Sequence, residues 1–159
     1  MMPGWFDLKG LTEEAADSCD GCDDSIKLIN NMFDIENQKY GIPYNKMIFG
    51  GFSQGGAMSI YGGLNRDANK KLAGVISCSG FLPNPTSFTI PSGSEDTKVL
   101  MTHGDADPVV PIVWGKKTLE YIKNKGAKEV EFKTYKDLPH SVNNNTFEDI
   151  MNFIDQVLK

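Results

Sequence analysis

The central stretch of this chain reads Lys46-Met47-Ile48-Phe49-Gly50-Gly51-Phe52-Ser53-Gln54-Gly55-Gly56-Ala57. Its apolar start predicts a short buried strand over 46–49, and the small residues from Ala57 to about Leu64 predict a helix. A Gly-x-Ser-x-Gly pattern lies between them. A serine on such a sharp turn takes a strained backbone, so we expect the glycines on both sides to be required because the turn leaves no room for side chains. Taken alone, the pattern also fits a glycine-rich structural turn.

Short apolar runs alternate with helical segments on both sides of this turn. Strands are predicted over 72–77, 98–102 and 129–135, and the last fits a sheet edge because its apolar and polar residues alternate. The predicted helices cover 25–40, which Ser25 can cap, 113–124, and 146–158, with an apolar face of Phe147, Ile150, Met151, Ile154 and Leu158. This alternation predicts an α/β fold with a mainly parallel sheet and helices on both faces.

Candidate catalytic residues follow three of the predicted strands, at the end where parallel sheets of α/β proteins bind ligands. Ser53 follows the first of them, Asp107 follows the strand over 98–102, and His140 follows the strand over 129–135. A serine hydroxyl needs a base, and that base needs an orienting carboxylate. The order Ser-Asp-His is the one expected of an α/β-hydrolase.

The partners of Ser53 each have an alternative explanation. Asp107 precedes a proline and could serve only to turn the chain, and Asp105 is a rival carboxylate two residues earlier. His140 could be an ordinary loop residue. His103 lies against the end of its strand, which favours a structural hydrogen bond over a role as the base.

The composition restricts the remaining possibilities. With 159 residues, of which 40% are hydrophobic, we expect one domain over 1–159 with irregular structure over 1–24. A net charge of -5 without a basic cluster argues against binding to nucleic acid. The sequence contains no apolar run of spanning length and no signal peptide, so we expect no stable membrane insertion.

Three cysteines argue against a disulfide scaffold and favour a reducing, cytoplasmic location. Cys19 and Cys22 have the spacing of a redox or metal pair. They lack a second Cys or His pair and a preceding strand, which argues against that use. Cys78 follows the strand over 72–77 and is expected to be a buried, inert thiol.

Together these residues closely resemble the acyl-protein thioesterase and lysophospholipase family of cytosolic serine hydrolases. The resemblance runs from Met2 to the C-terminus and is carried by Trp5-Phe6-Asp7, Gly50-Gly51-Phe52-Ser53-Gln54-Gly55-Gly56-Ala57, Leu72-Ala73-Gly74-Val75, His103-Gly104-Asp105-Ala106-Asp107-Pro108-Val109-Val110-Pro111 and Phe132-Lys133-Thr134-Tyr135 with His140. It implies an α/β-hydrolase fold, with Ser53 as nucleophile, Asp107 as orienting acid and His140 as base. It further implies hydrolysis of palmitoyl thioesters on proteins, of lysophospholipids and of simple esters, with no metal and no organic cofactor.

The chain departs from the family at its N-terminus. Family members have a further segment before the position of Met2, which contains a central strand and the strand and loop that supply the second oxyanion-hole amide. We therefore expect an N-terminally truncated form of the fold in which Gln54 supplies one amide and the second donor has no candidate. The strand over 46–49 then becomes an open apolar edge, a predicted site of self-association.

Three functions follow from this reading. The first is a thioesterase or lysophospholipase in which Trp5, Phe6, Leu8 and Leu82 form an apolar wall for the acyl chain, although Leu82 fits a place in the core equally well. The second is a catalytically impaired fragment that acts as a binding or pairing module through its open edge. The third is a carboxylesterase for small esters, with no protein substrate.

Overall fold

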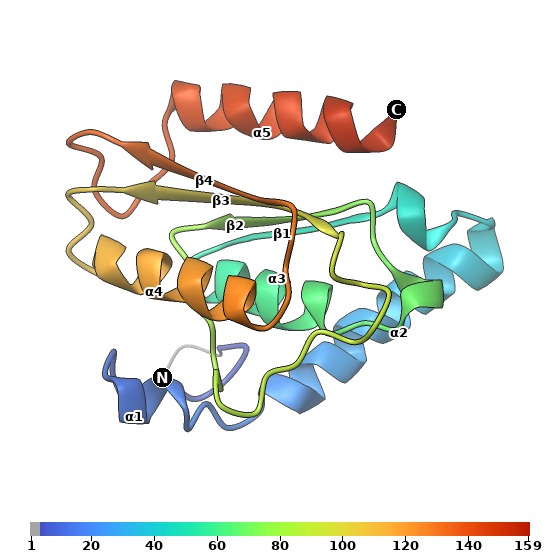
Figure 1. Ribbon diagram of the computed structural model, residues 1–159, viewed down its shortest axis with the longest axis horizontal. Coiled ribbons are helices and arrows are strands. Elements are labelled where there is room, and N and C mark those ends of the chain that lie inside the picture. The colour runs from blue at the N-terminus through green and yellow to red at the C-terminus, as the bar shows by residue number, and fades with distance from the viewer. Residues whose placement is uncertain (1–3) are drawn as a thin grey trace.

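A parallel sheet of four strands forms the centre of the computed structural model, which describes residues 4–159 (Figure 1). Its strands are β1 (Ile48–Phe52), β2 (Gly74–Cys78), β3 (Lys98–Gly104) and β4 (Val130–Tyr135). They lie in the order β1-β2-β3-β4, and every neighbouring pair is parallel. The predicted strands are therefore all present, with ends that differ from the prediction by at most three residues.

Helices cover both faces of this sheet, as the sequence predicts (Figure 1). One face carries α5 (Asn144–Leu158), whereas α3 (Gln54–Leu64) and α4 (Ile112–Asn124) lie against the other. Two more helices, α1 (Glu13–Ala16) and α2 (Cys22–Tyr40), lie on the outer side of that second layer. The 3-10 turns η1 (Tyr44–Lys46) and η2 (Ala68–Lys70) precede β1 and β2.

The larger hydrophobic core lies between the sheet and the layer of α2, α3 and α4. Helix α3 runs through it with Ala57, Met58 and Ile60 fully buried, and β2 is buried along its whole length. A smaller core on the opposite face joins Ile76 and Leu100 to α5. Because β2 and β3 are central, the two edges of the sheet are β1 and β4, as the sequence predicts for the 46–49 and 129–135 strands.

The start of α2 differs from the prediction. The helix begins at Cys22 rather than Ser25, after Gly21 in a left-handed conformation (φ 89°). Ser25 lies in its first turns and does not cap it; its hydroxyl donates instead to the carbonyl of Trp5. The expectation of irregular structure over 1–24 is likewise only partly right, because α1 lies within this range; residues 1–3 are outside the described residues.

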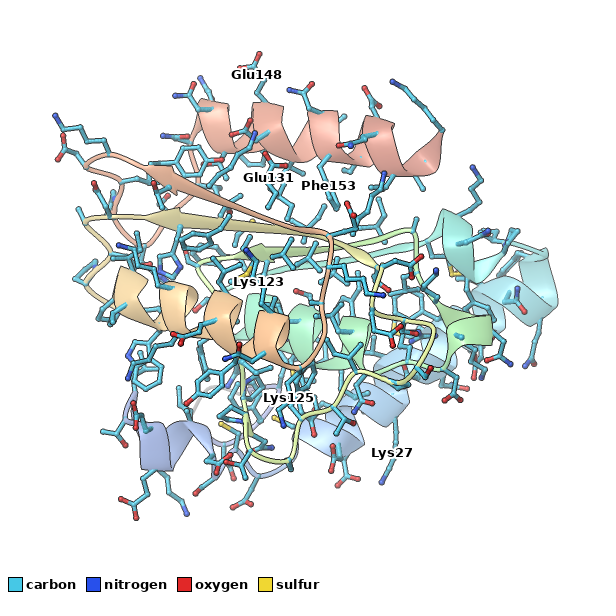
Figure 2. The ribbon with its side chains drawn as sticks, viewed as in Figure 1. Lys27, Lys123, Lys125, Glu131, Glu148 and Phe153 are labelled. Carbon is cyan, nitrogen blue, oxygen red and sulfur yellow. The ribbon has the colours of Figure 1, made fainter. Side chains whose placement is uncertain are left out.

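Helix α5 also presents a different face from the one predicted. Figure 2 shows Phe153 directed toward the sheet and Glu148 directed away from it. Phe153 is buried, with Ile150 and Ile154 partly buried beside it, whereas Phe147 and Met151 are more than half exposed. The helix begins with a capping box in which the Asn143 side chain accepts from the amide of Thr146.

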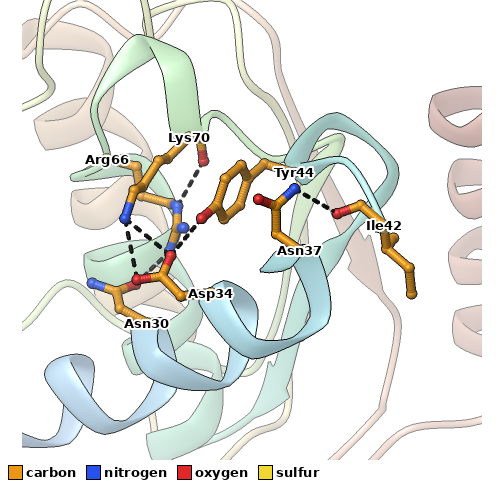
Figure 3. A network of polar contacts seen from close by, with 7 residues as sticks. All are labelled: Asn30, Asp34, Asn37, Ile42, Tyr44, Arg66 and Lys70. Atoms are coloured by element: carbon orange, nitrogen blue, oxygen red, sulfur yellow. Dashed lines mark hydrogen bonds and ion pairs between the residues drawn. The ribbon is translucent and has the colours of Figure 1, made fainter. Parts of the chain in front are cut away.

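A polar network joins the C-terminal half of α2 to the turns before β1 and β2 (Figure 3). The buried guanidinium of Arg66 donates to Asn30 and to the carbonyl of Lys70, and it lies over the rings of Phe33 and Tyr44. Asp34 accepts from Tyr44 and Lys70. This network fixes α2 beside η1 and so beside the start of β1.

Within residues 4–159, no helix combines the length and the apolar character that crossing a membrane requires.

Candidate active site

Three loops meet at the carboxyl ends of β1, β3 and β4, which is the edge where ligands bind in sheets of this kind. Ser53 directly follows β1 and precedes α3. Asp107 lies in the loop between β3 and α4, and His140 lies in the loop between β4 and α5. The three residues that the sequence analysis groups are therefore brought to one place by the parallel topology.

Ser53 occupies a strained turn. Its φ of 56° and ψ of -118° are unusual for a residue with a side chain, and its amide donates to the carbonyl of Cys78 at 2.8 Å. A Cβ at Gly51 would lie 2.2 Å from the backbone of Gly55, so glycine is required there. At Gly55 the expectation is wrong, because a Cβ would meet nothing within 4 Å; the second tight position is Gly56, where a Cβ would approach Cys78 at 3.0 Å.

The side chains of Ser53, His140 and Asp107 form a continuous chain of hydrogen bonds. Nε2 of His140 lies 2.9 Å from Oγ of Ser53, and Nδ1 lies 2.7 Å from Oδ2 of Asp107. An ionised carboxylate can only accept, so Nδ1 carries a proton and donates it to Asp107. In the neutral ring Nε2 is then the acceptor, and the Ser53 hydroxyl donates to it. A hydroxyl bonded to such an oriented imidazole is suited to nucleophilic attack.

Asp107 divides its two oxygens between two tasks. Oδ1 accepts from the amides of Val109 and Val110, both at 2.9 Å, while Oδ2 faces His140. Burial alone raises the pKa of Asp107, but the hydrogen bonds from His140, Val110 and Val109 outweigh it and leave the pKa below its ordinary value. Asp107 thus both turns the chain and holds the imidazole, so the two explanations raised by the sequence are compatible.

The rival residues of the sequence analysis make other hydrogen bonds, although Nε2 of His103 lies 3.6 Å from Oδ2 of Asp107. His103 is only 2% exposed, and its Nε2 donates to the carbonyl of Val110 at 2.7 Å. Burial lowers its pKa, which favours the neutral ring. Asp105 accepts from the amide of Asp137 at 2.7 Å and so ties the loop after β3 to the loop after β4.

Phe52 belongs to the site although the sequence analysis did not select it. Its ring centroid lies 4.7 Å from that of the His140 imidazole, and its side chain is 42% exposed. The available signal was its place directly before Ser53, since the residue before a turn at a strand end projects at the rim of the sheet. Packing against Phe52 adds a second contact to the His140 ring besides its hydrogen bond to Asp107.

The surroundings of Ser53 are a shallow hollow and a larger groove beside it. The hollow, about 500 Å³, is lined by Gly4, Trp5, Phe52, Ser53, Gln54 and Gly55. The groove, about 590 Å³, follows β1 and α2 and includes Ile29, Met32, Phe33 and Phe49. Ser53 also precedes the first turn of α3, where backbone amides such as that of Gln54 have no partner within the helix and favour negative charge.

Only Trp5 of the four residues expected to form an acyl wall lines these two spaces. Phe6 and Leu82 are buried in the larger core, where Phe6 packs edge-on against Phe81. Leu8 is 39% exposed. Burial gives Phe6 and Leu82 a packing role, and substrate binding by these two and by Leu8 stays a prediction.

All three cysteines are buried. Cys78 adjoins the site through its backbone, because its carbonyl accepts from the Ser53 amide. The amide of Cys19 donates to the Asn84 side chain, and its thiol donates to the carbonyl of Ala16 at 3.3 Å. Cys19 therefore helps to fix the segment before α2 against the loop after β2. Burial raises the pKa of Cys78, as expected of an inert thiol.

The sequence matches the phospholipase/carboxylesterase family over residues 1–158. It is 37% identical to acyl-protein thioesterase 1 of Debaryomyces hansenii, covering 100% of this chain and 69% of the relative. It is 35% identical to acyl-protein thioesterase 1 homolog 1 of Dictyostelium discoideum, covering 99% and 69%.

Solved structures give a consistent result for the fold. The SOBER1 structure from Arabidopsis thaliana superposes with a TM-score of 0.82 at 28% identity, covering 99% of this chain and 75% of that one. Acyl-protein thioesterase 2 of Zea mays superposes with a TM-score of 0.82 at 24% identity, covering 98% and 73%. At 24% identity, the likeness to the Zea mays structure concerns the fold alone.

Proposed function

Because the chain belongs to the phospholipase/carboxylesterase family of hydrolases, with an α/β-hydrolase fold, we propose that it is a serine hydrolase that cleaves acyl thioesters and esters. The substrate classes we propose are palmitoyl thioesters on proteins and lysophospholipids. The observation that carries the proposal is the hydrogen-bonded chain from Ser53 through His140 to Asp107.

The first half of the reaction is acyl transfer to Ser53. Nε2 of His140 takes the hydroxyl proton while Oγ attacks the acyl carbonyl carbon, and Asp107 stabilises the imidazolium that forms. The amide of Gln54, at the positive end of α3, donates to the oxyanion of the tetrahedral intermediate. The intermediate collapses, the bond to the thiol or alcohol breaks, and His140 returns the proton to the leaving group.

The second half is hydrolysis of the acyl-enzyme. His140 takes a proton from a water molecule, and the hydroxide attacks the same carbonyl carbon. Collapse of this second intermediate releases the carboxylic acid, and the proton on His140 returns to Oγ of Ser53.

Labelling with a fluorophosphonate tests this mechanism. The wild-type chain is expected to be labelled on Ser53 and to hydrolyse p-nitrophenyl acetate, and Ser53→Ala is expected to lose both reactions. Ser87→Ala is the matched control, because Ser87 is an exposed serine in the loop after β2. An unlabelled wild type, or equal labelling of Ser53→Ala, would exclude the mechanism.

The acyl preference requires a separate measurement. An S-palmitoylated peptide and its S-acetyl counterpart, compared at equal concentration, distinguish a thioesterase for long acyl chains from a carboxylesterase for small esters. The apolar groove beside Ser53 supports the long-chain substrate. Cleavage of the acetyl form alone would instead favour the small-ester activity.

Self-association through β1 is a second candidate, favoured by one observation. Within the described part of the chain, β1 pairs only with β2, and its outer edge borders the apolar groove. An edge of this kind can accept a strand from a second copy. Sedimentation equilibrium of the wild type is expected to show a dimer. Met32→Lys, in the groove, is expected to dissociate this dimer, whereas Met151→Lys, on α5, is expected to leave it intact. A wild type that is monomeric at all concentrations would exclude self-association through β1.

A further inference from the structure

The side chain of Gln54 holds the N-terminal segment against the active site. Its Oε1 accepts from the amide of Trp5 at 2.8 Å, and its Nε2 donates to the carbonyl of Phe6 at 2.8 Å. One carboxamide thus satisfies backbone groups of two successive residues, which lie 49 and 48 residues away in the sequence. Neither interaction involves the backbone amide of Gln54, which is the group that the proposed mechanism uses.

The rest of this segment is fixed around the same point. The carbonyl of Trp5 accepts from the hydroxyl of Ser25 in α2, and the side chain of Phe6 is buried in the core. Gly4 lies so close to the carboxamide that a Cβ there would be 2.9 Å from Oε1. The backbone of Trp5 is therefore held on both sides, while the residue as a whole remains 47% exposed.

The indole of Trp5 lies where the two spaces beside Ser53 adjoin. Trp5, Phe52 and Gly55 line both the hollow that contains Ser53 and the apolar groove along β1 and α2. An acyl chain on Ser53 that extends toward the groove must pass these three residues. Of the three, Trp5 is the one whose backbone belongs to neither β1 nor α3, so its position depends on the contacts that hold it.

We propose that the Gln54 side chain is a positioning residue, which holds Trp5 as the wall that sets the preference for long acyl chains. This inference rests on the proposed hydrolase function and extends it. A fixed indole offers an apolar contact at no further ordering cost to the enzyme, whereas a released one must be ordered each time a long chain binds. A short acyl group has less apolar surface to place against the indole, so it is expected to gain less from this contact.

The test compares p-nitrophenyl octanoate with p-nitrophenyl acetate in four variants. Gln54→Met keeps the length of the side chain and removes both hydrogen bonds, and it is expected to lower the octanoate-to-acetate ratio of kcat/KM about tenfold. Trp5→Ala is expected to lower the same ratio. The double variant is expected to fall no further, because Gln54 acts through Trp5. Gln38→Met, an exposed position on α2, should match the wild type.

Amide exchange provides a readout that needs no catalysis. In the whole chain labelled with ¹⁵N, the Trp5 amide is expected to exchange at least about tenfold faster in Gln54→Met than in the wild type. Gln54→Glu retains an acceptor for that amide and should restore part of its protection. The Ser53 amide, bonded to Cys78, reports that the fold is intact and should stay protected in each variant.

The outcomes separate this inference from the function on which it rests. An unchanged octanoate-to-acetate ratio in Gln54→Met, or a further tenfold fall in the double variant, would overturn the role of Gln54 while leaving the hydrolase mechanism intact. Equal exchange rates of the Trp5 amide in wild type and Gln54→Met would show that the Gln54 side chain does not hold Trp5 in place. A wild type that cleaves neither ester would overturn the hydrolase function, and the acyl preference with it. Exchange of the Trp5 amide would still show whether the Gln54 side chain holds Trp5.

Discussion

Nδ1 of His140 lies 2.7 Å from Oδ2 of Asp107, and the other oxygen of that carboxylate is held by two backbone amides. The amides belong to Val109 and Val110, which lie two and three residues after Asp107 in the chain. A carboxylate anchored in this way cannot turn to follow the imidazole, so it fixes both the orientation of the ring and the nitrogen that carries the proton. The position of His140 is therefore set by the loop after β3 as much as by its own loop.

Asp107→Asn is expected to reduce ester hydrolysis roughly 10³- to 10⁴-fold. The amide can keep one oxygen on the backbone amides, but its NH₂ group then faces Nδ1 and favours the tautomer that protonates Nε2. That tautomer cannot accept the Ser53 proton. Steady-state hydrolysis of p-nitrophenyl acetate measures the loss, and the unfolding transition in urea confirms that the variant is folded.

Asp105→Asn is the control for this change. Asp105 lies two residues before Asp107, and its carboxylate accepts a hydrogen bond from the amide of Asp137 rather than from a side chain of the site. Activity within a few-fold of wild type is expected, because an asparagine oxygen can still accept from that amide. If Asp105→Asn lost as much activity as Asp107→Asn, the assignment of the orienting carboxylate would be wrong.

Alanine substitutions at Gly51 and Gly55 are expected to have opposite effects on stability. At Gly51 the new methyl would lie 2.2 Å from the backbone of Gly55, so the turn must shift, and we expect unfolding to become easier by about 2 kcal/mol or more. At Gly55 the methyl meets nothing within 4 Å, and alanine in a helix is favoured over glycine by up to about 1 kcal/mol. Urea unfolding measures both, and equal destabilisation would contradict the geometry.

The glycines of this turn show how far sequence reasoning reaches. The pattern around Ser53 indicates a sharp turn, and the order of Ser53, Asp107 and His140 along alternating strands places all three at one end of a parallel sheet. Which glycine is sterically required depends on how β1 meets α3 and on the neighbouring Cys78 carbonyl, so it cannot be obtained from spacing. Gly55 satisfies the pattern without being crowded, and Gly56 is crowded without belonging to it.

Other differences have the same origin. Phe147 and Met151 fit a helical apolar face as well as Phe153 does, but α5 turns toward the sheet the face that carries Ile150, Phe153 and Ile154. The start of α2 moves to Cys22 because Gly21 can adopt a left-handed conformation, which releases Ser25 to bond Trp5. In each case a contact between distant segments selects among options that are locally equivalent.

Arg66→Met is expected to lower the free energy of unfolding by about 2–4 kcal/mol. Methionine retains the buried stem but leaves the Lys70 carbonyl and the Asn30 side chain without their charged donor, and it removes the cation from the rings of Phe33 and Tyr44. Arg66 is only 5% exposed, so water reaches the guanidinium poorly, and this burial lowers its pKa. Urea unfolding measures the change.

Lys27→Met is the matched control for Arg66. Lys27 forms an ion pair with Asp24 on the exposed face of α2, where both side chains are more than three-quarters exposed. Exposed ion pairs contribute little to the free energy of unfolding, so we expect Lys27→Met to unfold at the same urea midpoint as the wild type. If the two substitutions moved the midpoint equally, the buried network would not stabilise the fold as described.

His103 is expected to make the stability of this fold depend on pH near neutrality. Burial holds its pKa below the ordinary value of 6.5, although the Val110 carbonyl and Asp107 act in the opposite direction. Between the folded pKa and 6.5 the unfolded chain binds a proton that the folded chain does not, so the free energy of unfolding falls as the pH is lowered from 7 through this range. The slope of the free energy of unfolding against pH is at most about 1.4 kcal/mol per pH unit.

His103→Gln keeps a donor for the Val110 carbonyl and cannot titrate. The free energy of unfolding of this variant should therefore vary less between pH 7 and pH 5, as measured by urea unfolding at each pH. Parallel curves for variant and wild type would show that His103 does not titrate differently in the two states.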